Sequence, residues 1–259
     1  MLENTFVHLS GVGPKSEQSL WTQGCLTWSD YLADPRSFSV GSASKSLIRQ
    51  ELEFSQHALE EGRHQFFARR LKMKDAWRAY EAFADSCLYL DIETDGTNNA
   101  NCVTTIGMYD GNTFRCLVQG VDLEVFRDAI SHYSMIVTFF GTGFDLPVLQ
   151  RRFRGIDFDQ IHLDLCPTLR AVGYRGGLKK IEKDFGIKRS PETEGLSGLD
   201  AVRLWRQYRW GRESALDRLI AYNREDVVNL KQLAEKAMSL LRQQSGFPGD
   251  LEATAASAT

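Results

Sequence analysis

Between residues 86 and 165, the predicted strands and helices follow one another in an order that is compatible with few folds. Its five apolar runs of strand type occupy residues 86–92, 102–109, 113–118, 135–140 and 161–165. The turn Asp110-Gly111-Asn112 joins the second and third runs as a hairpin, and helical patterns over 123–133 and from Phe144 separate the later runs. Three antiparallel strands followed by alternating helix and strand predict an α/β fold with a mixed five-stranded sheet flanked by helices.

The composition of the chain narrows the class of protein. Its 259 residues are 42% hydrophobic and 25% charged, which is typical of a soluble globular protein, and the net charge of −3 provides no global positive field for nucleic acid. No apolar run approaches the roughly 20 residues of a transmembrane helix, and residues 1–4 show no signal-peptide pattern, so we expect no association with a membrane. Five scattered cysteines without a Cys-x-x-Cys pair favour a reducing, cytoplasmic location over a disulfide framework or a zinc site.

Glycines and a proline near the N-terminus predict a tight turn that opens a helix. Gly11 and Gly13 permit close approach of the backbone, and Pro14 suits the first helical position, before Lys15. The free amide groups at such a helix start form an anion site. The segment resembles the hairpin and second helix of a helix-hairpin-helix DNA-binding motif, and the alternative is a capped helix that only packs on its surroundings.

The patterns divide the chain into four parts. Residues 1–45 are expected to form the helix-hairpin-helix-like element, and residues 46–84 a helical connector with a break near Glu61-Gly62. The α/β domain is expected over residues 85–242. The small and polar residues 243–259 predict a disordered tail.

The first predicted strand ends with two carboxylates. Asp91 and Glu93 are two residues apart and therefore point to the same face of the sheet, with Ile92 on the other face. Two like charges held side by side repel, and a bound divalent cation offsets that repulsion. The pair indicates a metal site, whereas a strand end that runs into the polar turn 95–99 is the alternative.

Two further carboxylates stand in contexts that complete such a site. Asp145 follows the fourth predicted strand, at the start of a helix. Asp226 lies in a helical pattern with Tyr222 four residues before it, so the two side chains share a face of the helix on its core side. An unpaired buried charge is costly, and a metal shared with Asp91 and Glu93 would give Asp226 a partner.

These elements together resemble the three exonuclease motifs of the DnaQ-like DEDD superfamily, which has the ribonuclease H-like fold. The motifs correspond, in order, to Asp91-Ile92-Glu93, Gly143-Phe144-Asp145-Leu146-Pro147 and Tyr222-x-x-x-Asp226. The tyrosine four residues before the last aspartate is similar to the DEDDy branch, and Ala221 stands where the histidine branch has its histidine.

Segments that link the motifs resemble one subgroup, the YprB-like predicted exonucleases. The matching segments are 163–165, 177–182 and 221–223, together with 11–15 near the N-terminus. The second motif departs from the superfamily pattern, because Phe140 and Gly141 stand where an asparagine is often found.

The resemblance implies a 3′-5′ exonuclease that hydrolyses phosphodiester bonds at the 3′ ends of DNA or RNA with two Mg²⁺ or Mn²⁺ ions. Asp91 would bridge both ions, Glu93 and Asp226 would share the first, and Asp145 would lie nearer the second. Tyr222 would orient the attacking water. A structure-selective endonuclease and a catalytically inactive nucleic-acid-binding module of the same fold are the alternatives.

Basic and motif-flanking residues are candidates for holding the nucleic-acid strand. The expected contacts are Gly11, Gly13, Lys15, Thr94, Phe144, Arg151, Lys179 and Lys180. Ordinary solvated helix faces are the alternative for the basic residues among them. Trp205, Tyr208 and Trp210 are expected in the core or in an interface rather than as stacking platforms for bases.

Overall fold

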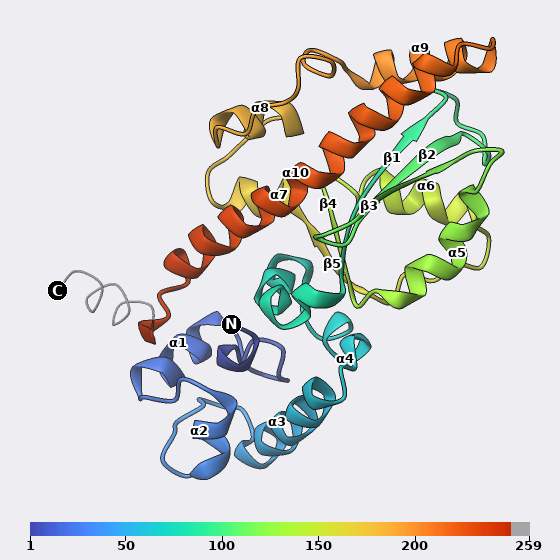
Figure 1. Cartoon of the computed structure of the whole chain (residues 1–259). Helices are drawn as coiled ribbons and strands as arrows, with labels where there is room; N and C mark the ends of the chain where they lie inside the picture. The colour runs from blue at the N-terminus through green and yellow to red at the C-terminus, as the bar shows by residue number, and fades with distance from the viewer. Residues whose placement is uncertain (250–259) are drawn as a thin grey trace. The chain divides into compact units, whose positions relative to one another are not determined.

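The structure is a computed structural model that describes residues 1–249 (Figure 1). It contains two compact units. One unit comprises residues 1–84 together with the segment from Met238 onward, and the other comprises Asp85–Ala237. Within residues 1–249, none of the helices combines the length and the apolar character that crossing a lipid bilayer requires.

The Asp85–Ala237 unit is built on a five-stranded sheet. Its strands are β1 (Cys87–Thr94), β2 (Val103–Tyr109), β3 (Phe114–Val118), β4 (Met135–Thr138) and β5 (Ile161–Asp164). The strand order is β3-β2-β1-β4-β5, with β1 at the centre. The pairs β1–β2 and β2–β3 are antiparallel, whereas β1–β4 and β4–β5 are parallel. This arrangement confirms the predicted mixed sheet of three antiparallel strands followed by alternating helix and strand.

Helices of this unit connect and cover the strands. They are η4 (Leu123–Val125), α5 (Phe126–Ala129), η5 (Ile130–His132), α6 (Asp145–Arg152), α7 (Leu165–Ala171), α8 (Leu178–Asp184), α9 (Gly198–Arg209) and most of α10 (Glu213–Ser245). The expected single helix over 123–133 is three short helical pieces. Its apolar residues Leu123, Phe126 and Ile130 are nevertheless buried, because their spacing of three and four suits both 3₁₀ and α geometry.

Strand β4 ends two residues earlier than expected. Phe140 has a φ of 67°, a left-handed conformation that no strand continues. Its backbone amide donates to Asp164 Oδ1 at 2.8 Å, and the amide of Thr142 donates to Asp164 Oδ2 at 3.0 Å. The carboxylate at the end of β5 therefore shapes the loop that leads into α6.

The two faces of the sheet carry different side chains. Leu88, Leu90 and Ile92 point to one face, where they pack in a core with residues of α5 and α6. Alternation along β1 places Asp91 and Glu93 on the opposite face. A second core on α9 and the first half of α10 includes Trp205 and Tyr222.

Helix α10 approaches the sheet closely at one glycine. A Cβ atom on Gly107 of β2 would lie 2.3 Å from Asn223 Oδ1 and 2.6 Å from Val227 Cγ2. Only glycine leaves room for α10 at this position, so Gly107 sets the depth at which the helix lies on the sheet.

Trp210 lies outside the core, which was one of the two locations expected for it. Trp205 is 4% exposed, whereas Trp210 is 83% exposed. The buried residues of α9 are Ala201, Leu204 and Trp205, and Trp210 follows the last helical residue, outside that spacing.

The other unit is helical. Its elements are η1 (Leu2–Asn4), α1 (Pro14–Thr22), α2 (Trp28–Ala33), α3 (Lys45–Glu60), α4 (His64–Ala68), η2 (Met73–Ala79), η3 (Glu81–Ser86, whose last residues belong to the sheet unit) and the end of α10. Gly13 is the N-cap of α1 and Pro14 its first residue, as the sequence suggested. The expected break of the connector helix lies at Gly62, which has a φ of 65°.

The first residues of the expected tail, 243–249, are structured. Helix α10 continues to Ser245, and Phe247 is buried with its ring 5.3 Å from that of Trp21. Phe247 was overlooked because most residues of 243–259 are small and polar, yet its one aromatic ring packs against Trp21. Residues 250–259 lie outside the described part of the chain.

Candidate metal centre

Three carboxylates from two elements meet on the polar face of β1. Asp91 and Glu93 come from the central strand, and Asp226 comes from α10. One oxygen of each lies within 4.8 Å of the corresponding oxygens of the other two. Glu93 is 8% exposed and Asp226 6%. The alternation of β1 and the close approach of α10 at Gly107 therefore bring together three of the four carboxylates singled out in the sequence.

The fourth carboxylate, Asp145, lies beside this group and not within it. It is the first residue of α6 and is 2% exposed. Its Oδ1 accepts a hydrogen bond from the backbone amide of Ile92 at 3.1 Å, which holds the side chain against β1. Burial, together with the charges of Asp164 and Asp226, raises the pKa of Asp145 to about 7, although the amides of Ile92 and Asp145 itself act in the opposite direction.

The surroundings of the cluster disfavour its negative charges. Burial, followed by the charges of neighbouring carboxylates, raises the pKa of both Asp91 and Glu93 well above their ordinary values. Burial also raises the pKa of Asp226, and the guanidinium of Arg189 opposes that shift. Carboxylates in this arrangement require a cation if all are to be charged at neutral pH.

The donor set fits a hard divalent cation. All of its potential ligand atoms are carboxylate oxygens, which Mg²⁺ and Mn²⁺ prefer. The buried Oδ1 of Asp226 forms an ion pair with Arg189, and it has no hydrogen-bond partner within residues 1–249. A buried carboxylate oxygen beside two other carboxylates is the feature expected of a ligand atom.

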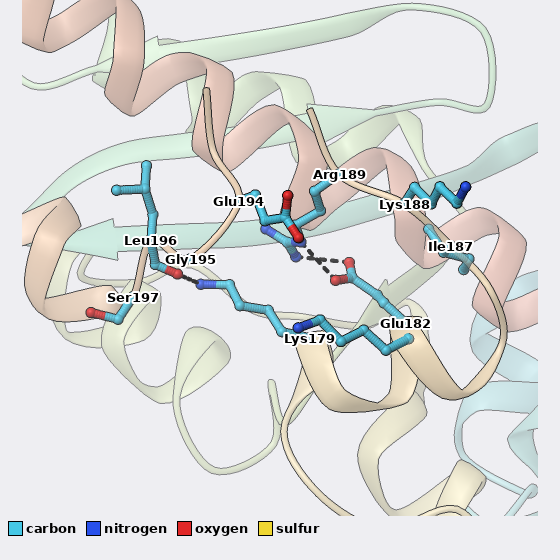
Figure 2. A pocket seen from close by; sticks show the side chains of 10 residues that line it. Lys179, Glu182, Ile187, Lys188, Arg189, Glu194, Gly195, Leu196 and Ser197 are labelled. Carbon is cyan, nitrogen blue, oxygen red and sulfur yellow. Dashed lines mark hydrogen bonds and ion pairs between the residues drawn. The ribbon is translucent and has the colours of Figure 1, made fainter. Parts of the chain in front are cut away.

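Arg189 is a buried cation at the rim of the cluster. Its Nε and Nη2 donate to the two oxygens of Glu182 at 2.6 and 2.7 Å, and Nη2 also forms an ion pair with Asp226. Asn229 Nδ2 donates to the same Glu182 at 2.9 Å. The hydrogen bonds to Glu182, drawn in Figure 2, hold the guanidinium of Arg189 in place beside Asp226.

Lys179 holds the tyrosine of the cluster. Its ammonium group donates to the hydroxyl of Tyr222 at 2.9 Å and lies 4.4 Å from the centre of the tyrosine ring. It also donates to the carbonyl oxygen of Leu196, and Figure 2 shows the side chain extended toward that atom along a cavity of about 510 Å³. Burial lowers the pKa of Lys179, and it raises the pKa of Tyr222 together with the charges of Asp226 and Glu93.

Several residues around the cluster were not singled out from the sequence as parts of a site. Asn223 Nδ2 donates to Asp91 Oδ2 at 2.9 Å, and Asp164 holds the loop before Asp145. Asn223 directly follows Tyr222, so a polar residue next to a motif position was the available signal. Nothing in the local pattern indicated the pairing of Glu182 with Arg189, because it depends on the course of the loop after α8.

The predicted nucleic-acid contacts are dispersed. Thr94 ends β1 beside Glu93, and Phe144 precedes Asp145 with 42% of its surface exposed. Lys180 forms an exposed ion pair with Asp184 at 2.6 Å, in contrast to the neighbouring Lys179. Arg151 is exposed on α6, and the remaining three, Gly11, Gly13 and Lys15, belong to the helical unit.

Comparisons with known proteins bear on the family. Among solved structures, the chain is similar to the family B DNA polymerase from the hyperthermophilic archaeon Pyrobaculum calidifontis, with 19% sequence identity and a TM-score of 0.47. That match covers 58% of this chain and 24% of the polymerase chain, so this chain spans about a quarter of the polymerase's length. No curated protein matches the sequence. The sequence profile of the RNase_H superfamily matches residues 88–238, which contain the whole sheet and the carboxylate cluster, and the chain belongs to the RNase H superfamily.

Proposed function

We propose that this chain is a metal-dependent 3′-5′ exonuclease that hydrolyses phosphodiester bonds of DNA or RNA. The observation that carries the proposal is the convergence of Asp91, Glu93 and Asp226, with Asp145 beside them, on one face of the central strand. Nuclease activity in general accords with membership of the RNase H superfamily. The direction of cleavage rests on the resemblance of the three motifs to those of the DEDD exonucleases.

The proposed branch of that superfamily rests on the resemblance of the residue beside the cluster. Tyr222 lies four residues before Asp226 on α10, as in the DEDDy branch, and its ring is buried. The linking segments support assignment to the YprB-like subgroup. A cytoplasmic location, inferred from the cysteine pattern, stays a prediction.

The carboxylates would hold two Mg²⁺ or Mn²⁺ ions. Bound divalent ions supply Lewis-acid stabilisation of charge on the phosphate and lower the pKa of nearby water. Asp91, Glu93 and Asp226 offer the oxygens that lie closest together, and Asp145 retains one oxygen that no hydrogen bond occupies within residues 1–249. Asn223 orients Asp91 through its amide, which fixes the direction of that carboxylate's second oxygen.

Tyr222 and Lys179 act together on the water that attacks the phosphate. A tyrosine hydroxyl has an ordinary pKa of about 10, so at neutral pH it orients water rather than removing a proton. The ammonium of Lys179 donates to the Tyr222 oxygen, so the hydroxyl proton is directed away from the lysine. The hydroxyl is then directed toward Asp226 and the neighbouring carboxylates, where a water or a phosphate oxygen would bind.

End-labelled single- and double-stranded DNA and RNA, incubated with Mn²⁺ or Mg²⁺, test the proposal. Products that shorten progressively from the 3′ end support an exonuclease, whereas a single internal cut would support a structure-selective endonuclease. Binding without cleavage in either metal would support an inactive binding module.

Substitutions of two aspartates, one inside the carboxylate cluster and one outside it, test whether cleavage depends on the cluster. Asp91→Ala is expected to abolish cleavage with the fold retained, as judged by circular dichroism. Asp217→Ala, at an exposed position of α10, is the matched control and should cleave at the wild-type rate. Wild-type activity in Asp91→Ala would contradict the metal site.

A further inference from the structure

One tryptophan of the chain is almost fully exposed. Trp210 is 83% exposed, whereas the other four, Trp21, Trp28, Trp77 and Trp205, are all buried. An exposed indole offers a large flat surface that a ligand can cover, and beside charged groups it is a candidate contact for such a ligand. The indole of Trp210 also stacks on no other ring within residues 1–249.

Two unpaired cations accompany this tryptophan. The side chains of Arg206 and Arg209, on the last turn of α9, form no hydrogen bond or ion pair with any residue of the described chain. They line a cleft of about 390 Å³ together with Trp210 and Asp95. The carboxylate of Asp95 is engaged by Thr97, whose amide and hydroxyl donate to its Oδ1 at 2.8 and 2.7 Å. The cleft therefore combines an exposed aromatic face with net positive charge.

The cleft lies next to the candidate metal centre. Asp95 is two residues after Glu93, at the end of the same strand. Helix α9 packs against this strand end, because a Cβ atom on Gly96 would lie 3.3 Å from Val202 Cγ1. In Figure 1, α9 lies beside the loop that follows β1. A nucleic-acid strand whose 3′ end lies at Glu93 would therefore pass close to the cleft, because Asp95 in the cleft lining is only two residues from Glu93.

We propose that this cleft binds a single-stranded segment of nucleic acid, with a base stacked on the indole of Trp210 and backbone phosphates bound by Arg206 and Arg209. Every base has a π face, so stacking needs no particular sequence, and guanidinium groups pair with phosphates. The inference rests on the proposed function, since the bound segment is part of the strand whose 3′ end enters the metal centre.

Binding of oligonucleotides tests the cleft separately from cleavage. The probes are single-stranded thymidine and uridine oligonucleotides of about 12 nucleotides, labelled at the 5′ end and titrated with the full chain in EDTA so that they stay intact. Trp210→Ala is expected to weaken binding by about 5- to 100-fold, and Trp210→Phe, which keeps a π face, to restore part of the affinity. Leu199→Ala removes another exposed apolar side chain, which lies on α9 and is 72% exposed, and is the matched control.

The salt dependence of binding tests the two arginines. Replacing both Arg206 and Arg209 by alanine is expected to reduce the slope of log affinity against log salt by about 1.4, because each phosphate contact on a single strand contributes about 0.7. Arg203→Ala, on the same helix but paired with Asp200, should leave the slope unchanged.

The outcomes distinguish this inference from the proposed function. Equal oligonucleotide affinity of wild type, Trp210→Ala and the double arginine variant overturns the cleft, even if the wild type cleaves from 3′ ends. Absence of binding by the wild type also overturns it. Binding that depends on Trp210, without cleavage in any metal, supports the cleft and refutes the exonuclease. If both hold, Trp210→Ala raises KM on long strands and leaves kcat unchanged.

Discussion

Each unit of this chain buries a glutamate, and the surroundings of the two side chains are opposite. Glu17 in the helical unit is 1% exposed, and its oxygens accept from Thr5 Oγ1 at 2.7 Å, from Phe6 N at 2.6 Å and from Arg78 at 2.9 Å. Glu93 in the sheet unit is 8% exposed and accepts no hydrogen bond or ion pair within residues 1–249. Its nearest charged groups include Asp91 and Asp226, which repel it.

The difference distinguishes Glu17, a carboxylate that stabilises the fold, from Glu93, a carboxylate whose surroundings suit a bound cation. Donors around Glu17 compensate for its lost hydration, so its charge ties the first residues to α1 and to Arg78. Around Glu93, the fold places carboxylates that repel it and no hydrogen-bond donor from the described chain, and the charges of Lys179 and Arg189 offset this repulsion only in part, which costs stability unless a cation binds. The same substitution, glutamate to glutamine, should therefore have opposite effects at the two positions.

The largest expected effect is on cleavage by Glu93→Gln. Removing one ligand charge should reduce the rate at least about 1000-fold, because several kcal/mol of charge stabilisation are lost. In EDTA, the free energy of unfolding should stay the same or rise by about 1 kcal/mol, since the substitution relieves repulsion. Rate assays with Mn²⁺ and urea titrations measure both quantities. A clear loss of stability in EDTA would mean that the fold itself needs the charge.

Glu17→Gln should reverse that pattern. Breaking a buried ion pair while leaving Arg78 in place is expected to lower the free energy of unfolding by about 3–5 kcal/mol. Cleavage per folded molecule should not change. The control is Glu53→Gln, which breaks an exposed pair with Arg49 and should cost less than about 1 kcal/mol. Similar losses in the two variants would contradict the structural role of Glu17.

The helical unit should also lose stability in acid through His8. Burial, with the charges of Arg70 and Arg78, lowers the pKa of His8 to about 3. Between this value and its ordinary pKa of 6.5, the unfolded chain binds a proton that the folded chain does not, so stability falls as the pH is lowered. At pH 5 the loss is about 2 kcal/mol relative to pH 7.5.

His8→Gln removes this titration, and the comparison of its unfolding free energy with that of the wild type across the window isolates the histidine. The wild-type curve should fall more steeply below pH 6.5 than the variant curve. Parallel curves would show that His8 is protonated in the folded chain. Glu51 and Glu17, which also lie near this part of the unit, are present in both proteins and cancel in the difference.

The smallest expected effect is that of Lys179 on Tyr222. Lys179→Met should lower kcat by about 10-fold with KM nearly unchanged, because one charge-assisted hydrogen bond to the hydroxyl is lost. In a Tyr222→Phe background the same substitution should have almost no further effect. Lys180→Met, on the exposed side of α8, is the control. Additive effects of the two substitutions would separate the lysine from the tyrosine.

The sequence predicted which side chains share a face wherever that direction depends on local periodicity. Alternation along β1 places Asp91 and Glu93 on one face, and the spacing of four places Tyr222 and Asp226 on one face of α10. The order of strands and helices was likewise enough to predict the mixed sheet, since each connection has few topological solutions.

Sequence periodicity did not predict the environment of a side chain where that environment depends on packing against distant segments. Lys179 and Lys180 look alike in the sequence, yet the first meets Tyr222 and the second an exposed aspartate. The early end of β4, before Phe140, depends on a hydrogen bond from Phe140 to Asp164, which lies 24 residues later in the sequence. Local preferences carry no information about such distant partners.

What the sequence alone determined was the fold class and the set of carboxylates, because both follow from short-range periodicity and from the order of the elements. Tertiary structure decided which groups surround those carboxylates. Asn223 reaches Asp91 across 132 residues of sequence, and Gly107 is what lets α10 come close enough for that contact. It also decided that Trp210 stands exposed beside the strand end, because burial depends on which helix faces find a partner and not on the hydrophobicity of one residue.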